Sequence, residues 1–598
     1  MLVVAGPGAG KTKVITDRVK YVLTNISGNF RVLALTFTNK AANEMKDRLY
    51  EIPDLEKRAF VGTIHSFCSS ILKNRGEPVG LGDDLHILNT IEDRKKVLIE
   101  SLNLDPELKN TLKSTLSDQN QEKLLSKWLE AISQFKRDLI LPEMVKEETD
   151  RRIYEIYDST MRASNLFDFD DLLLKTYTLF VSNPSIPEFY RRLYKYICID
   201  EAQDLNRAQY EIIRLMCESN HNNVLMVGDP NQSIFGFVGA NKKYMDLFEK
   251  DFDARKIHLD ENFRSAKAIT TAARKIIPDV DINENLPVNG VVSLIVGNDE
   301  KEEAELVLKK LKEFVNNADS TEDKLTWNSC ALIGRNRYVL YPIESELISN
   351  GIPYYKQESI KQLSESDLMK EFELGLEILS NPQDLLHLKA LLSRWNSSVD
   401  PRDLVDSGIQ GQEVIKRLKN LSVTKNDVVL EALSKVSTGP NKFSLNESLV
   451  FLKNSTAGIR DTEERELLIK DITEWNTLWN YYLRNQNLIE RSPAKFLNFT
   501  SERSIKKEDN NGLALLTVHS AKGLEFELVV VMGMVEGVFP DYRAHGKDLD
   551  EEKRNAFVSI TRSKRFLFLS YPKTRLMPWG EIFKVKPSRF LFDIGLLP

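Results

Sequence analysis

Two short, widely separated motifs constrain what this chain can fold into. The first, AGPGAGKT at residues 5–12, follows an apolar stretch at 2–4 and precedes an amphipathic stretch at 13–19. The second, DEAQD at residues 200–204, follows four residues typical of a buried strand, YICI at 196–199. A glycine-rich turn between strand and helix, with acidic residues at the end of another strand, indicates a parallel α/β sheet with a ligand at its carboxyl edge.

The first motif has the composition of a phosphate-binding loop. Small residues allow successive backbone N–H groups to point inward, and Gly6, Gly8, Ala9 and Gly10 supply them. Lys11 is predicted to reach the β- and γ-phosphates of a nucleoside triphosphate, and the Thr12 hydroxyl to contact Mg²⁺. Ala5 occupies a position where the strict pattern has glycine, which the loop tolerates if φ there is negative. The alternative is a glycine-rich turn without a ligand.

The acidic motif supplies the second half of such a site. Asp200 is predicted to hold Mg²⁺, and Glu201 to orient or deprotonate the attacking water, because phosphoryl transfer depends on positioning and charge stabilisation. A solvated acidic loop is the alternative, but the preceding strand-type residues disfavour it. The two motifs together predict hydrolysis of ATP with Mg²⁺ as cofactor.

Length, charge and cysteine content limit the number of domains, the kinds of partner and the compartment that are compatible with this chain. A chain of 598 residues is too long for one core and predicts three or four domains. The net charge of −6 provides no overall basic field, so a nucleic-acid contact requires a local groove. The four cysteines lack the paired spacing of a metal site and favour a reducing compartment. With no membrane-span or signal-peptide pattern, we expect a cytoplasmic protein.

Strand-like and helix-like stretches alternate along much of the chain, which predicts two parallel sheets. Helical, charged sequence from about 76 to 187 interrupts the first sheet, and similar sequence from about 358 to 510 interrupts the second. The predicted strands are 2–4, 31–38, 61–67, 196–199, 224–227 and 256–259 in the first series, and 291–296, 331–333, 513–518, 528–532 and 566–570 in the second.

The ordered set of motifs resembles the superfamily 1 DNA helicases of the UvrD, Rep and PcrA type over nearly the whole chain. The motifs that carry the resemblance are residues 5–12, TFTNKAA at 36–42, GTIHSF at 62–67, 200–204, 228–240, NFRS at 262–265, TVHSAKGLEF at 517–526 and 552–562.

The resemblance implies an α/β fold with two RecA-like P-loop NTPase motor domains, each with a mainly helical inserted subdomain. The first motor domain is expected at 1–75 and 188–285, with its insertion at 76–187. The second is expected at 286–357 and 511–598, with its insertion at 358–510.

Roles in ATP hydrolysis also follow from the resemblance. Gln232 would sense the γ-phosphate, while Arg264 and Arg562 would be arginine fingers reaching the cleft from opposite sides. A guanidinium is permanently charged and forked, so it stabilises the transferring phosphate only when the cleft closes. Phe263 stands where the family usually has a tyrosine that stacks on adenine, and Glu525 would meet the ribose.

A single-stranded DNA track is expected across both sheets, held by phosphate contacts and aromatic stacking. Each aromatic residue taken alone is more often part of a core. The predicted base contacts are Phe37, Phe235 and Phe237; the predicted phosphate or coupling residues are Asn39, Thr63, His65 and His519; and Trp579 lies near the family's aromatic wedge at the duplex junction.

The resemblance therefore implies an ATP-dependent helicase that moves 3′ to 5′ along single-stranded DNA and unwinds tailed duplex. One alternative is a nucleotide-gated DNA-binding subunit that recruits or regulates a partner nuclease, for example in phage defence. Another is an RNA helicase, since stacking tolerates either sugar. A nuclease or a repair protein is the expected kind of partner. Family members also carry about twenty residues before the P-loop strand, including a glutamine that reads adenine. A weak preference among nucleoside triphosphates is therefore expected of the sequence as given, and the alternative is a truncated or misassigned start.

Overall fold

A computed structural model shows two compact units, each built from segments that are distant in the chain. One unit comprises Met1–Phe67, Phe180–Gln357 and Glu508–Pro598, and the other Cys68–Leu179 and Glu358–Lys507. The structure describes residues 1–81, 86–88, 90–114, 118–217, 223–236, 239–278, 280, 283–284, 286, 288–316, 325–356, 364, 366–406, 408–421, 427–438, 442–456, 462–485, 491–504, 511–576 and 582–598.

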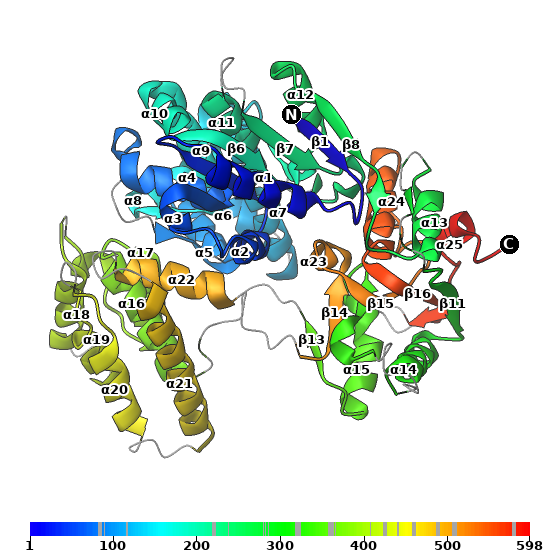
Figure 1. The fold of residues 1–598 in the computed structure, drawn as a ribbon. Coiled ribbons are helices and arrows are strands. Elements are labelled where there is room, and N and C mark those ends of the chain that lie inside the picture. The colour runs from blue at the N-terminus through cyan, green and yellow to red at the C-terminus, as the bar shows by residue number, and fades with distance from the viewer. Residues whose placement is uncertain are drawn as a thin grey trace. The chain divides into compact units, whose positions relative to one another are not determined.

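The first unit contains two six-stranded sheets in which every pair of neighbouring strands is parallel (Figure 1). The first sheet has the order β3-β2-β6-β7-β1-β8. Its strands are rich in Val, Leu and Ile, as expected for strands covered on both faces. Their bounds are Leu2–Ala5 (β1), Arg31–Thr36 (β2), Ala59–Thr63 (β3), Tyr194–Ile199 (β6), Val224–Gly228 (β7) and Lys256–Leu259 (β8).

Helices connect these strands and bury their apolar sides against them. Ile15, Val19 and Val22 of the first helix, for example, join Val3 and Val227 in one buried cluster. Each such side chain contributes about 1.5–3 kcal/mol when fully buried. The first sheet and its helices form the first lobe of this unit, and the second sheet and its helices form the second lobe. The helices of the first lobe are Lys11–Asn25 (α1), Asn39–Arg48 (α2), Leu55–Arg58 (α3), Ile64–Arg75 (α4), Ser185–Leu193 (α10), Arg207–Cys217 (α11) and Lys243–Asp251 (α12).

The second sheet has the order β11-β16-β15-β12-β14-β13. Two buried clusters, one on each face, form the core of this lobe. The strands are Val291–Gly297 (β11), Cys330–Gly334 (β12), Tyr354–Lys356 (β13), Leu513–Thr517 (β14), Phe526–Met532 (β15) and Ser563–Pro572 (β16).

The helix Lys267–Ile276 (α13) follows the first sheet in sequence but packs with the second. Its buried residues Ile269, Ala273 and Ile276 belong to the same cluster as Phe557 and Leu567. The other helices of this lobe are Glu300–Asn316 (α14), Tyr341–Ser349 (α15), Val518–Ala521 (α23), Lys547–Ile560 (α24) and Arg589–Ile594 (α25). Two short ribbons, Glu261–Asn262 (β9) with Asn283–Glu284 (β10) and Thr574–Leu576 (β17) with Ile582–Lys584 (β18), complete the unit.

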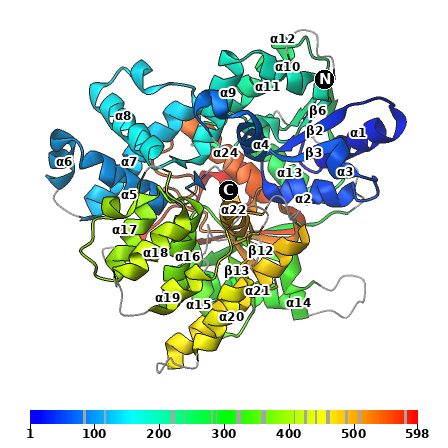
Figure 2. The same ribbon diagram turned by 90° about the vertical axis from the view of Figure 1, so that its left-hand side faces the viewer.

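The second unit is mainly helical and has two apolar clusters of its own. Its long helix Thr462–Asn485 (α21) lies beside Asn446–Ser455 (α20) in both views (Figures 1 and 2). The remaining elements are His86–Ile87 (β4), Ile91–Leu102 (α5), Pro106–Lys113 (α6), Asp118–Arg137 (α7), Glu148–Ala163 (α8), Leu166–Phe167 (β5), Phe169–Ser182 (α9), Asp367–Ser380 (α16), Leu385–Arg394 (α17), Gly411–Asn420 (α18), Asp427–Ser434 (α19) and Pro493–Ser504 (α22).

The predicted fold class, an α/β fold with two parallel-sheet domains and mainly helical insertions, is confirmed. The strand predicted at 61–67 is wrong beyond Thr63, because helix α4 begins at Ile64. The Thr63 hydroxyl accepts a hydrogen bond from the Ser66 N–H (3.1 Å), which satisfies a donor in the first turn of that helix. Within the described part of the chain, no helix is both long and apolar enough to span a bilayer.

Candidate active site

The predicted phosphate-binding motif forms the loop between β1 and α1. Ala5 is the last residue of β1 and has an extended backbone, so alanine is tolerated at this position. Gly8 and Gly10 have φ of 72° and 81°, a region that favours glycine. Nζ of Lys11 lies 3.4 Å from the carbonyl oxygen of Ala5 and 3.5 Å from that of Gly6, which holds the ammonium over the loop.

The segment Asn262–Arg264 packs directly on this loop. Asn262 Nδ2 donates to the carbonyl oxygen of Pro7 (2.7 Å), and the Phe263 N–H donates to that of Gly8 (3.1 Å). A Cβ on Gly8 would lie 2.8 Å from Cβ of Arg264, so only glycine permits this approach. This packing brings Arg264 to the end of the first sheet where the glycine-rich loop lies. The Phe263 side chain is 60% exposed, which leaves its ring accessible to a ligand.

The acidic pair lies at the carboxyl end of β6. The Asp200 N–H donates to the Leu35 carbonyl (2.8 Å), and the Glu201 N–H donates to Asp200 Oδ1 (2.9 Å). Thr12 Oγ1 lies 3.5 Å from Asp200 Oδ2. This pair of hard oxygen donors beside a phosphate loop fits Mg²⁺, which binds through one or two protein oxygens and keeps several waters.

The pKa values of Asp200 and Glu201 are shifted in opposite directions. Burial and the neighbouring charge of Glu201 raise the pKa of Asp200 to about 7. Burial also opposes ionisation of Glu201, but the positive charges of Lys11, Lys522 and Arg562 outweigh it and lower its pKa. Lys11 belongs to the first lobe and the other two cations to the second, so both lobes act on one carboxylate.

A chain of hydrogen bonds connects Glu201 to the second lobe. The Gln203 side chain donates to Glu201 and accepts from the Asp229 N–H (2.8 Å). Gln232 Nε2 donates to Asp229 Oδ2 (2.6 Å), and Gln232 Oε1 accepts from Nη2 of Arg562 (3.3 Å). Gln232 and Arg562 are both buried, so this contact between lobes is shielded from water.

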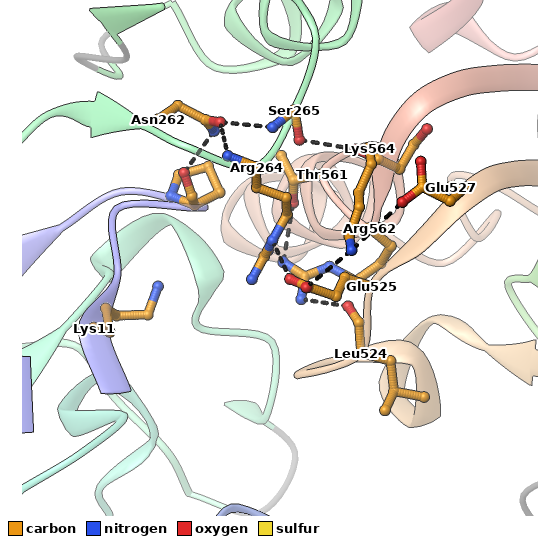
Figure 3. A network of polar contacts seen from close by, with 12 residues as sticks. Lys11, Asn262, Arg264, Ser265, Leu524, Glu525, Glu527, Thr561, Arg562 and Lys564 are labelled. Carbon is orange, nitrogen blue, oxygen red and sulfur yellow. Dashed lines mark hydrogen bonds and ion pairs between the residues drawn. The ribbon is translucent and has the colours of Figure 1, made fainter. Parts of the chain in front are cut away.

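Arg562 follows α24 and is held by acceptors on every side. Its Nε donates to the Val558 carbonyl (3.0 Å), Nη1 to the Leu524 carbonyl (3.2 Å) and Nη2 to Thr561 Oγ1 (3.2 Å). Burial and the charge of Arg264 lower the pKa of Arg562. These bonds hold the guanidinium in one orientation, and Figure 3 shows Arg562 with Leu524 and Thr561.

Arg264 and Glu525 form a second connection between the lobes. Arg264 Nε lies 2.6 Å from Glu525 Oε2, while Lys564 Nζ lies 3.3 Å from Glu525 Oε1. In Figure 3 this pair lies between Lys11 on one side and Leu524 on the other, beside Arg562. The six residues predicted to act in hydrolysis, Lys11, Asp200, Glu201, Gln232, Arg264 and Arg562, are therefore brought to one seam between two lobes.

Lys522 is a component that the sequence argument missed. Its Nζ lies 2.5 Å from Asp204 Oδ2 and 2.6 Å from the Gln232 carbonyl oxygen, and both side chains of this ion pair are buried. Burial raises the pKa of Asp204 to about 7, although the Lys522 charge opposes this shift. The available signal was position alone, since Asp204 ends the acidic motif and Lys522 lies in the motif at 517–526.

Three predicted DNA contacts gather beside Lys522. The rings of Phe37 and Phe235 are stacked, with centroids 5.1 Å apart, and the His519 ring lies 6.0 Å from Phe235. The Lys522 ammonium lies 4.8 Å from the centre of the Phe235 ring. Lys522 thus contacts both the backbone of Gln232 and the aromatic cluster.

The other predicted DNA contacts are more dispersed. Asn39 is exposed at the start of α2, and His65 is half-buried at the start of α4. Thr63 ends β3 beside Thr36 of β2 and is buried, with its hydroxyl engaged in capping α4. Phe237 and Trp579 lie outside the described residues.

Replacement of His519 by glutamine should weaken the dependence of stability on acid pH. Burial, followed by the charge of Arg335, lowers the pKa of His519 from 6.5 to about 4. Between these values the unfolded chain binds a proton that the folded chain does not. Stability of the wild type therefore falls as pH falls through this window, by up to about 3 kcal/mol.

Thermal unfolding between about pH 7 and pH 4.5 measures this effect. The Tm of His519→Gln should decline less steeply than that of the wild type. His545→Gln, at an exposed histidine, is the matched control. Parallel declines of wild type and His519→Gln would contradict the prediction.

Two family models match this chain. The UvrD/REP helicase N-terminal domain matches residues 1–253, and the UvrD-like helicase C-terminal domain matches residues 257–407 and 410–574. The ATP-dependent DNA helicase PcrA of Staphylococcus aureus (strain Mu50) is 29% identical over 650 residues, covering 99% of this chain and 84% of the relative. The same helicase of Staphylococcus epidermidis (strain RP62A) is 28% identical over 647 residues, with the same coverage.

Proposed function

The chain belongs to the UvrD-like family of ATP-dependent DNA helicases, and from this premise we propose that it moves 3′ to 5′ along single-stranded DNA and unwinds duplex. The observation that supports a motor best is the buried hydrogen bond between Arg562 of one lobe and Gln232 of the other. Through Asp229 and Gln203 this contact reaches Glu201, so the arrangement of the lobes and the catalytic carboxylate are coupled.

In this proposal each residue at the contact between the lobes has one role in hydrolysis. Lys11 binds the β- and γ-phosphates, and Glu201, whose lowered pKa keeps it ionised, orients the water or accepts its proton. Gln232 senses the γ-phosphate, while Arg264 and Arg562 stabilise charge on the transferring group. Gly6, Gly8, Ala9 and Gly10 line the phosphate cradle, Phe263 stacks on the base and Glu525 contacts the ribose.

Thr12 and Asp200 would hold Mg²⁺ at this site. When bound, the ion neutralises charge on the triphosphate and on the acidic pair. The raised pKa of Asp200 is consistent with this assignment, because a buried pair of carboxylates favours a nearby cation.

The same contacts between the two lobes would couple hydrolysis to movement along DNA. Gln232 and Arg562 keep their positions only while the lobes are closed, so loss of the γ-phosphate favours opening. Lys522 connects Gln232 to Phe235, and Phe235 stacks on Phe37. We assign these rings, with His519, Asn39, Thr63 and His65, to the single-strand track, and Phe237 and Trp579 stay predictions.

The proposal also assigns domains to segments of the chain. The segments 1–75 with 188–285 and 286–357 with 511–598 are the two motor domains, and 76–187 and 358–510 are their insertions. A cytoplasmic location is also part of the proposal and is supported by four buried, unpaired cysteines, Cys68, Cys198, Cys217 and Cys330.

Strand displacement on tailed duplexes tests the function. We expect the purified chain to separate a duplex with a 3′ single-stranded tail only when ATP and Mg²⁺ are both present. An identical duplex with a 5′ tail is the control for polarity. Displacement from the 5′ tail alone would overturn the assigned direction. DNA-stimulated hydrolysis without displacement would instead favour a subunit that acts with a nuclease or repair partner.

A further inference from the structure

Three tyrosines on the second lobe are exposed to an extent that is unusual for large aromatic side chains. Tyr338 and Tyr542 are each 72% exposed, and Tyr341 is 51% exposed. The rings of Tyr338 and Tyr341 contact each other edge to face, with centroids 5.6 Å apart and planes at 85°. Grouped exposed aromatic side chains indicate a binding surface more often than scattered ones do.

The backbone fixes Tyr338 and Tyr341 in this outward position. Between them, Val339 and Leu340 are buried in the core of the lobe. The Asn336 side chain accepts a hydrogen bond from the Val339 N–H (3.3 Å), which caps the short 3₁₀ helix Arg337–Leu340. A Cβ on Gly533 would lie 2.6 Å from Val339 Cγ1, so the strand-end loop packs tightly beneath. The rings of Tyr338 and Tyr341 therefore lose little conformational freedom when a ligand binds.

These tyrosines lie at the edge of the sheet that carries His519. Gly334, the last residue of β12, is in register with Thr517 of β14 and Met532 of β15. The loops after the three parallel strands therefore leave the sheet at the same edge. The segment after β12 carries Tyr338, the short helix α23 after β14 carries His519, and the segment after β15 carries Tyr542.

A buried carboxylate connects two of these loops. Glu552 Oε1 lies 2.7 Å from Arg335 Nη2, and Glu552 Oε2 accepts from the Asp541 N–H (3.1 Å). The Arg335 charge also acts on His519, whose pKa it helps to lower. The segments that carry Tyr338 and Tyr542 are therefore joined through Glu552.

The charge of this surface favours a polyanion. Arg337 is exposed, and no carboxylate pairs with it among the residues that the structure describes. Two acids close in sequence to these tyrosines are paired with cations, since Asp541 lies 2.9 Å from Arg543 Nε and Glu344 lies 2.5 Å from Lys356 Nζ. Exposed aromatic rings beside an arginine are the combination that binds single-stranded nucleic acid, through base stacking and phosphate contact.

We propose that Tyr338 and Tyr341 form a base-stacking platform for single-stranded DNA, with Arg337 contacting its phosphates and Tyr542 at its margin. This tyrosine platform rests on the proposed DNA-motor function and extends the track from Phe37, Phe235 and His519 along the same sheet edge. A protein partner is less favoured, because the surface combines open rings with a guanidinium instead of a continuous aliphatic patch.

The test compares the affinity for a strand that carries bases with the affinity for a strand that has only the sugar–phosphate backbone. Binding of the full chain is measured for an oligothymidylate of about 20 nucleotides and for an abasic strand of equal length. Tyr338→Ala/Tyr341→Ala should weaken oligothymidylate binding by about 10-fold or more and leave abasic binding within about 2-fold. Tyr338→Phe/Tyr341→Phe should bind both strands like the wild type, since the ring faces remain.

Two further variants sharpen the result. Tyr21→Ala removes a tyrosine that is 60% exposed on α1 and should change neither affinity. Arg337→Gln should reduce the slope of log affinity against log salt by about 0.7, the value for one phosphate contact on a single strand. Thermal unfolding of each variant checks that the fold is retained.

The outcomes separate the platform from the motor function. If the double alanine variant binds oligothymidylate like the wild type while the wild type hydrolyses ATP in response to DNA, the platform is wrong and the motor stands. Equal losses on both strands would also overturn base stacking. If the double alanine variant changes only self-association or partner binding, the surface is a protein interface. A wild type that binds neither strand would refute the DNA-motor proposal itself.

Discussion

Replacement of Lys11 by alanine is expected to lower kcat for DNA-stimulated ATP hydrolysis by at least about 10³-fold. The ammonium is held over the phosphate loop by the carbonyl oxygens of Ala5 and Gly6, and it is one of three cations that keep Glu201 ionised. The variant would therefore lose the proposed phosphate contact and part of the positive charge that lowers the pKa of Glu201. The predicted DNA-contacting rings do not involve Lys11, so single-strand affinity in the absence of ATP should stay within about 3-fold.

Steady-state hydrolysis with saturating single-stranded DNA measures the effect. Lys13→Ala is the matched control, because Lys13 lies two residues away, is exposed and pairs with Asp17 (2.5 Å). Its loss should change kcat by less than about 2-fold, since exposed pairs contribute little. DNA-stimulated turnover retained in Lys11→Ala would overturn the assignment of the phosphate loop.

Replacement of Arg562 by lysine is expected to lower kcat by about 10³-fold, the lower end of the range for loss of an arginine finger. Lysine keeps the positive charge but has no planar fork, so it cannot contact Val558, Leu524 and Gln232 together. Loss of the Gln232 contact also disconnects the second lobe from the bonds that lead to Glu201. The decrease should appear in kcat, with binding of a non-hydrolysable ATP analogue largely retained.

Arg565→Lys provides the comparison for Arg562→Lys. Arg565 lies on β16 and pairs with Glu527 (2.8 Å), on the same lobe but outside the Arg562–Gln232 contact. We expect near-normal kcat for this variant. Thermal unfolding separates misfolding from catalysis, because Arg562 is buried. A folded Arg562→Lys protein with kcat within about 3-fold of the wild type would refute the proposed role.

Local sequence patterns predicted the elements that depend on short-range chemistry. The glycine spacing of residues 5–12 predicted a phosphate loop, and strand-type residues before Asp200 predicted an acidic strand end. The strand predicted at 61–67 was overextended because apolar Val61, Ile64 and Phe67 suit either a strand or a helix start. Thr63 decides the matter by capping α4 with its hydroxyl, a contact that hydrophobicity patterns do not report.

Contacts between distant segments were not predictable in the same way. The Lys522–Asp204 ion pair joins residues 318 positions apart, and neither residue differs from a surface charge when considered alone. Helix α13 follows the first sheet in sequence yet packs on the second, because its apolar face meets α24, α25 and β16 there. The tyrosine platform likewise depends on which residues beside Tyr338 and Tyr341 are buried.

By itself the sequence determined the two-sheet fold class and the helicase family, and it predicted the residues that we propose for ATP hydrolysis. These depend on periodicity, on glycine geometry and on the order of motifs, all of which are local properties of the chain. Only the tertiary structure decided how Arg264, Arg562 and Lys522 connect the lobes and which aromatic side chains are exposed. Pairing and burial arise when distant segments pack together, and the free energy of a charge or a ring depends on that surrounding.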